Sequence, residues 1–110
     1  MQKKVKILQP KERNEQTGGY WKILNTVKDP EIDVGIVDLG LVYDIINKNG
    51  YLTVTMTLTS MGCPMGPEIV ASVEEILRTQ KNVRDVKIHL VWEPAWSPER
   101  MHPDIREILL

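Results

Sequence analysis

The chain has one cysteine, Cys63, and its neighbours place the thiol between a predicted strand and a predicted helix. Residues 52–59 alternate apolar and hydroxyl side chains, which is typical of a strand, and apolar residues recur at helical spacing from Ile69 to Leu77. A thiol at the start of a helix faces unpaired N–H groups and the positive end of the helix dipole, and both favour the thiolate. Thiolates are nucleophiles and soft metal ligands. The alternative is that Cys63 is a small buried core residue.

A cysteine nucleophile needs a base, and the chain has only two histidines, His89 and His102. His89 falls on the polar side of a predicted strand, and His102 precedes Pro103 at a predicted helix start. Neither is expected to activate the thiol. The sequence also lacks Cys-x-x-Cys, a glycine-rich phosphate loop, Gly-x-Ser-x-Gly and His-Glu-x-x-His. The common redox, nucleotide-binding, hydrolase and zinc signatures are therefore absent.

Acidic and hydroxyl residues give a second set of candidates. Asp38 lies between apolar neighbours just before Gly40, and a partly buried carboxylate there must find hydrogen-bond donors. It either takes part in a site or caps the backbone, as acids in turns usually do. Glu31 comes from the same loop region. Thr59 and Ser60 precede Cys63 closely, so we expect their hydroxyls to line the same pocket.

Two tryptophans, Trp92 and Trp96, bracket the segment Glu-Pro-Ala at residues 93–95. Exposed tryptophans often anchor protein partners, which makes this region a candidate partner-binding surface. The alternative is that the pair closes an edge of the core. The second arrangement is the more frequent one, but the proline holds the backbone away from the sheet and makes full burial of the pair harder.

The length and net charge of the chain restrict the class of protein to which it can belong. We expect 110 residues to form one domain, with residues 1–16 as a flexible arm and residues 17–110 as the domain. Fourteen basic and fifteen acidic residues give a net charge of −1, which disfavours nucleic-acid binding. The apolar part of the amino terminus is too short for a signal sequence or a membrane span. A single cysteine cannot form an intramolecular disulfide, which fits the cytoplasm.

The periodicity predicts a two-layer α+β domain. A helix is expected near residues 19–27, capped by Thr17, and strands at 41–46 and 52–59 are joined by an Asn-Gly turn. A helix over 67–79, a strand over 83–92 and a short carboxy-terminal helix over 104–110 follow. The expected order is α-β-β-α-β with a short terminal helix, and the three-stranded sheet has helices over one face.

Four separated motifs resemble the SufT/PaaD-like proteins, a family of iron–sulfur cluster assembly factors. They run in the family's order and lie within about residues 20–106. The motifs are Asp-Pro-Glu-Ile at 29–32, Val-Asp-Leu-Gly-Leu-Val-Tyr at 37–43, Met-Thr-Leu-Thr-Ser-Met-Gly-Cys-Pro at 56–64 and Val-Trp-Glu-Pro-Ala-Trp-Ser at 91–97. One departure is Asp33, which stands where the family often has proline.

The resemblance implies a small α+β domain that acts as an accessory or carrier factor in iron–sulfur protein maturation. It implies that Cys63 is the key residue and that Asp38 and Glu31 are the family's acids. Clusters are commonly bound by four thiolates, so we expect Cys63 to ligate iron or a cluster transiently, with the other ligands from a second copy in a homodimer or from a scaffold or client protein. The alternatives are a cysteine-dependent enzyme with Cys63 as nucleophile and a metal-free adaptor.

Overall fold

The computed structural model describes residues 15–30, 32–59 and 66–109 of the chain. Within these ranges the chain forms a three-stranded sheet, three α-helices and one 3-10 turn. The elements in chain order are α1 (Glu15–Leu24), β1 (Val42–Lys48), β2 (Tyr51–Met56), α2 (Gly66–Arg78), β3 (Asp85–Leu90), η2 (Pro98–Arg100) and α3 (Pro103–Leu109). The predicted α-β-β-α-β order with a short terminal helix is confirmed.

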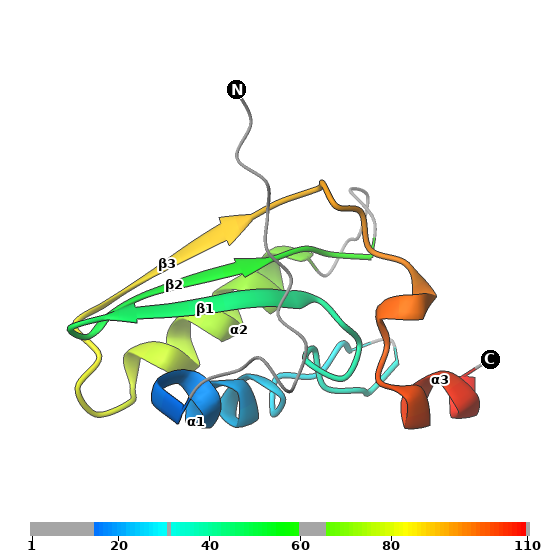
Figure 1. The fold of residues 1–110 in the computed structure, drawn as a ribbon, viewed down its shortest axis with the longest axis horizontal. Coiled ribbons are helices and arrows are strands. Elements are labelled where there is room, and N and C mark those ends of the chain that lie inside the picture. The colour runs from blue at the N-terminus through cyan, green and yellow to red at the C-terminus, as the bar shows by residue number, and fades with distance from the viewer. Residues whose placement is uncertain (1–14, 31, 60–65, 110) are drawn as a thin grey trace.

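The central strand of the sheet is β2. It pairs antiparallel with β1 and parallel with β3, so α2 is the crossover connection that the parallel pair requires. Both α1 and α2 lie on the same side of the sheet (Figure 1). The domain therefore has two layers, as the alternation of apolar and polar residues along the strands predicts.

The core lies between the sheet and these two helices. From the strands, Ile45, Leu52, Val54 and Met56 are buried, and from α2 the residues Ile69, Val73 and Leu77 follow the helical repeat. The loop between α1 and β1 contributes as well. Its buried residues Ile36, Leu39 and Leu41 have no exposed surface.

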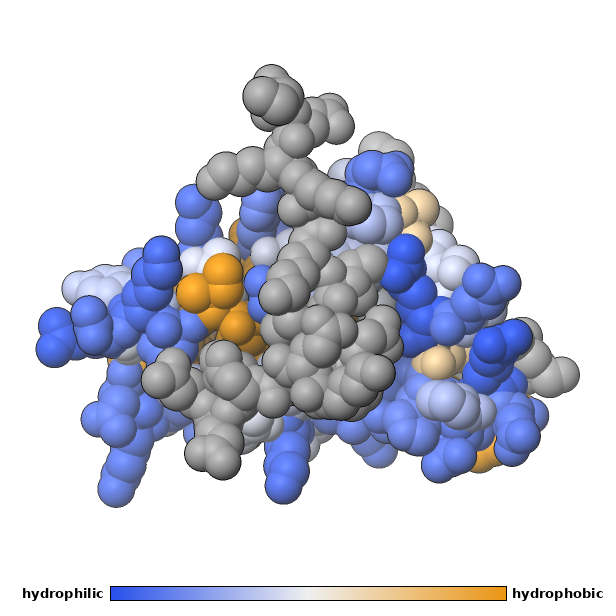
Figure 2. Space-filling model, viewed as in Figure 1, coloured by the Kyte–Doolittle hydropathy of each residue, from blue (hydrophilic) through white to orange (hydrophobic). Residues whose placement is uncertain are grey.

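The other face of the sheet is polar. The register places Asp44, Thr55 and His89 in one row across the three strands, and Ile46, Thr53 and Lys87 in the next. Hydrophilic residues dominate the side of the molecule seen in Figure 2, with a small hydrophobic patch over β1. Ile46 of that strand is 43% exposed. A single exposed residue of this kind is normal for a soluble surface.

Several boundaries differ from expectation, and β3 is two residues shorter at each end than the strand expected over 83–92. The first helix begins at Glu15, so Thr17 lies inside it rather than capping it, and it ends at Leu24 rather than near residue 27. Strand β2 ends at Met56 instead of reaching Thr59. Thr57 is fully buried and donates its backbone N–H to the carbonyl of Leu41 at 2.8 Å, so the polar alternation of the strand stops there. None of the helices in the described ranges is long and apolar enough to cross a membrane.

Candidate functional site

Asp38 lies in a turn that precedes β1, and its peptide groups are bound from both sides. Its N–H donates to the side-chain oxygen of Asn25 at 2.9 Å, and its carbonyl accepts from the N–H of His102 at 2.7 Å. The side chain is partly buried. Among the described residues, nothing forms a hydrogen bond or ion pair with its carboxylate. The backbone of Asp38 is therefore fixed, and its carboxylate has no partner among the described residues.

Residues 91–102, which we call the C-terminal clasp, pack against this turn. The Trp96 indole N–H donates to the carbonyl of Leu39 at 2.7 Å. The Tyr43 hydroxyl donates to the carbonyl of Pro94 at 2.8 Å. Together with the His102 contact, these bonds join the end of the chain to residues 38–43. The clasp and α3 lie at the end of the sheet where β1 begins, opposite the hairpin (Figure 1).

Gly40 is the point of closest approach between the turn and the clasp. Its φ is +82°, and a Cβ at this position would collide with the carbonyl oxygen of Arg100. Arg100 also places its guanidinium 5.3 Å from the centre of the Tyr43 ring, a cation–π geometry. Glycine supplies both the positive φ and the missing side chain, so no other residue fits here without strain.

Tyr43 is buried beneath this contact. Burial raises the pKa of its hydroxyl above the ordinary value of 10.0, the Arg100 charge lowers that pKa in part, and Glu93 raises it further. The hydroxyl is therefore neutral in the folded protein over the physiological pH range. It acts as a hydrogen-bond donor that ties β1 to the clasp.

Thr59 is the last described residue before the connection that contains Cys63. It is partly buried and lies two residues after Thr57. The Thr57 N–H donates to the carbonyl of Leu41, and Leu41 lies three residues after Asp38. The structure thus brings Thr59 and Asp38 to the same end of the sheet. Cys63, Ser60 and Glu31 lie outside the described residues. Within the described ranges, no group of three His, Cys, Asp or Glu side chains could hold a metal ion.

The two tryptophans are neither fully exposed nor fully buried. Trp92 and Trp96 both pack against the core while keeping part of their surface open. Trp96 is thus a structural element of the clasp as well as a candidate contact residue.

The two histidines lie on β3 and at the start of α3. His89 is exposed on the polar face of β3. His102 uses its ring Nδ1 to accept the N–H of Asp104 at 3.1 Å, so it caps the start of α3. This agrees with the expected role of His102 as a helix-start residue.

Other acids of the first loop have structural partners. The buried Asp29 donates its N–H to the carbonyl of Val34, and its own carbonyl accepts from Asp33. Asp33 has a φ of +61°, which proline cannot adopt. The backbone conformation at residue 33 therefore excludes the proline that the family often has there.

Sequence reasoning missed three residues at this end of the sheet. Asn25 binds the Asp38 peptide from the end of α1, Tyr43 binds the clasp, and Thr57 is buried. A tyrosine in the apolar run of β1 was a signal for a buried hydroxyl that needs a partner. Nothing in the local sequence marks Asn25, because its partner lies thirteen residues away.

Comparison with known proteins gives consistent matches. The sequence model of the family described as iron–sulfur cluster assembly protein matches residues 21–90. The Fe-S protein maturation auxiliary factor YitW of Bacillus subtilis is 48% identical over 79 residues, which are 71% of this chain and 78% of that protein. The corresponding factor SufT of Staphylococcus aureus is 46% identical over 76 residues, 68% of this chain and 86% of that protein.

A solved structure shows the same fold. The crystal structure of a domain of unknown function from Bacillus anthracis has a TM-score of 0.76 and 42% sequence identity, and the match covers 83% of this chain and 87% of that one. The α+β architecture is thus confirmed. The resemblance carried by the four motifs is confirmed as well, and with it the expected role in iron–sulfur cluster assembly: the chain belongs to the family of iron–sulfur cluster assembly proteins.

Proposed function

We propose that the protein is a carrier factor that ligates iron or an iron–sulfur cluster transiently through Cys63 and passes it to client proteins. Membership in the family supports a role in iron–sulfur protein maturation. The arrangement at Asp38 supports the location of the binding site. The observation that carries the proposal is that Asp38 has both peptide groups bound while its carboxylate has no described partner, at the end of the sheet from which the Cys63 connection leaves β2.

A single thiolate explains why binding would be transient. Clusters are commonly bound by four thiolates, so the cargo here would need further ligands from a second copy or from a scaffold or client. A thiol must lose its proton to bind metal. Asp38 would supply an additional oxygen ligand, and Glu31, Thr59 and Ser60 would complete the lining.

The partly open surfaces of Trp92 and Trp96 supply a contact surface beside this site. Tryptophan side chains that keep part of their surface open are frequent anchors in protein interfaces. We propose that scaffold or client proteins dock on these two residues, and that the clasp keeps the docking surface and Asp38 in one rigid unit. The free thiol fits a cytoplasmic location.

Anaerobic reconstitution with iron and sulfide tests the ligand role. Wild-type protein is compared with Cys63→Ala and with Thr55→Ala, a control on the polar face of β2. We expect visible cluster absorbance and activation of an apo iron–sulfur enzyme with wild type and control, and loss of both with Cys63→Ala. Equal behaviour of Cys63→Ala and wild type in both assays contradicts the proposal.

Asp38→Asn tests whether the Asp38 charge contributes to transfer in addition to the Cys63 thiol. This substitution keeps the shape of the side chain and the bound peptide groups but removes the charge. We expect slower transfer to the client with the fold unchanged by circular dichroism. If Asp38→Asn transfers at the wild-type rate, Asp38 has only a structural role.

A further inference from the structure

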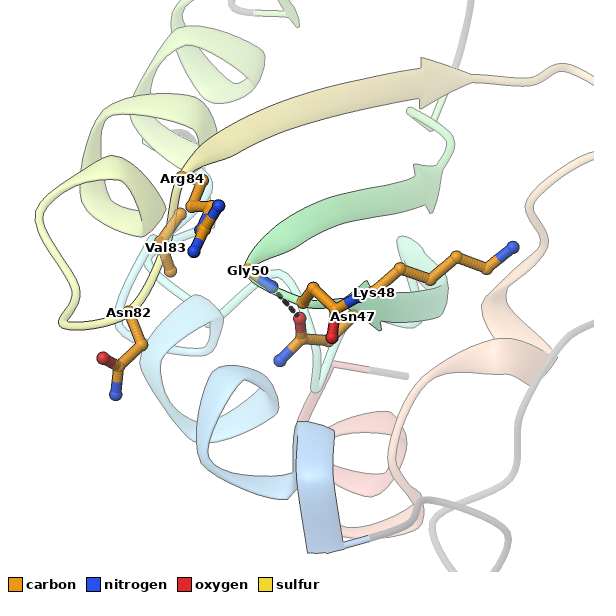
Figure 3. A pocket seen from close by; sticks show the side chains of 7 residues that line it. Asn47, Lys48, Gly50, Asn82, Val83 and Arg84 are labelled. Carbon is orange, nitrogen blue, oxygen red and sulfur yellow. Dashed lines mark hydrogen bonds between the residues drawn. The ribbon is translucent and has the colours of Figure 1, made fainter.

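A concave surface lies at the hairpin end of the sheet, far from Asp38. It has a volume of about 740 Å³ and is lined by residues 47–50 of the β1–β2 turn and residues 82–84 of the α2–β3 loop (Figure 3). The strands are six or seven residues long, so this surface is roughly 20 Å from the clasp. We call it the hairpin notch.

The two loops of the hairpin notch are locked together by their backbones. The Gly50 carbonyl accepts from the N–H of Arg84 at 2.7 Å, and the Gly50 N–H donates to the Asn47 side chain at 2.9 Å. Gly50 has a φ of +92°, and a Cβ there would lie 2.5 Å from the carbonyl oxygen of Asn82. The concave shape is thus preformed, which lowers the entropic cost of binding a ligand.

The lining residues carry positive charge and no negative charge. Lys48 and Arg84 are cations, the three asparagines provide amide donors, and no carboxylate is present in the lining. Both cations are exposed, and neither forms an ion pair within the described part of the chain. In Figure 3 Arg84 reaches into the space beside Gly50, whereas Lys48 extends along its strand.

The acid that follows Arg84 in the sequence already has a partner. Asp85 follows Arg84 directly, but its carboxylate accepts from Arg78 at 2.8 Å, and Arg78 also binds Glu74. The hydrogen bond from the Val86 backbone and that from Arg78 lower the Asp85 pKa. The charge of Arg84 therefore has no competing partner beside it.

We propose that the hairpin notch binds the phosphate group of a small anionic ligand, with Arg84 as the main contact. A guanidinium presents paired donors that match phosphate oxygens, and charge-assisted bonds of this kind are the strong ones. Lys48 also lines the notch, but its side chain extends away along its strand, so the asparagine amides add the other side-chain donors. This site is independent of the Cys63 chemistry.

The test is a titration of the full-length 15N-labelled protein. Backbone amide chemical shifts are recorded by NMR at constant ionic strength. One arm uses inorganic phosphate and another uses ADP. We expect saturable shifts that centre on residues 47–50 and 82–84 and that weaken when salt is raised, because salt screens exposed charges. Similar affinity for both ligands indicates that the phosphate group suffices, and tighter binding of ADP indicates a nucleotide.

Two variants with the same change in net charge make the test specific. Arg84→Gln is expected to weaken binding at least about tenfold, the effect of losing a charge-assisted contact. Lys87→Gln, an exposed cation on β3 outside the notch, should change affinity less than about twofold. The proposal is overturned if neither ligand gives saturable shifts in the notch, or if Arg84→Gln binds both ligands as wild type does.

Discussion

The two ends of the sheet are held together in different ways. At the hairpin end, backbone groups of two loops bind one another around Gly50. At the clasped end, side chains make the long-range bonds: Trp96 reaches Leu39 across 57 positions and Tyr43 reaches Pro94 across 51. The hairpin end therefore depends on turn chemistry, and the clasped end depends on side-chain partners that are distant in sequence.

The difference bears on what each end can do. A backbone-locked notch offers a preformed surface whose cation Arg84 forms no ion pair among the described residues. At the clasped end the side chains are already used to hold the turn, and the Asp38 carboxylate is left free among the described residues. We therefore expect substitutions at the clasped end to change stability and cargo transfer together, and substitutions of the cations at the hairpin end to change only ligand binding.

Glycine substitutions are expected to have the largest effect, and both ends should respond. Gly40→Ala and Gly50→Ala each place a Cβ at positive φ against a backbone carbonyl, which should lower the free energy of unfolding by about 2–3 kcal/mol or more. The control is Gly19→Ala in α1, where nothing lies within 4 Å. It should stabilise the protein by about 0.5–1 kcal/mol.

Urea denaturation measures all three glycine variants. If Gly40→Ala is as stable as wild type, the clasp does not approach the turn as closely as the structure shows. The same result for Gly50→Ala would remove the argument for a preformed notch.

The Trp96 donor comes next. Trp96→Phe leaves the Leu39 carbonyl without its indole partner, and we expect a loss of about 1–2 kcal/mol in unfolding free energy. Trp92→Phe is the matched control, because no hydrogen bond of the Trp92 indole is found within the described ranges, and it should cost less than half as much. Equal losses would mean that packing, not the hydrogen bond, holds the clasp.

Tyr43 provides a pH-dependent test of the same end. Its folded-state pKa lies above the unfolded value near 10, so its contribution is complete below about pH 10 and is lost as pH rises through the folded pKa. Tyr43→Phe should lose about 1 kcal/mol at neutral pH. Its stability should also fall less steeply than that of wild type under alkaline conditions.

Urea midpoints of wild type and Tyr43→Phe, measured from neutral pH to above pH 10, test this prediction. Parallel curves for wild type and Tyr43→Phe would show that the Tyr43 hydroxyl does not titrate differently in the folded and unfolded states.

The smallest effect is expected from Asp85 at the hairpin end. Its pKa is lowered, so its contribution is present above the ordinary value of 3.8 and is lost as pH falls below it. Asp85→Asn should be slightly less stable than wild type near neutral pH, and the difference should vanish under strongly acidic conditions. Glu107→Gln, an exposed acid of α3, serves as the control in the same acid titration.

Several features could be predicted from local sequence. The Asn-Gly turn was expected from residue type alone, and Asn49 and Gly50 have φ values of +54° and +92°. The four motifs identified the family, and the spacing of apolar residues predicted the order of helices and strands. These features depend on neighbours within one turn or one strand.

The predictions that failed depend on distant partners. Thr57 continues the hydroxyl alternation of β2 in sequence, yet it is buried, and its N–H binds the carbonyl of Leu41 just before β1. Thr17 has the residue type of a cap, but the helix begins two residues earlier. Residue type and periodicity report on local conformation and cannot show which loop another segment will cover.

The sequence by itself determined the α+β class, the family and the position of Cys63 between a strand and a helix. Only the tertiary structure decided that Asn25 and His102 bind the two sides of the Asp38 peptide and that Trp96 and Tyr43 tie the clasp to the same turn. The physical reason is that periodicity encodes which face of an element is buried, whereas these contacts arise only when packing of the core brings separate loops to one end of the sheet.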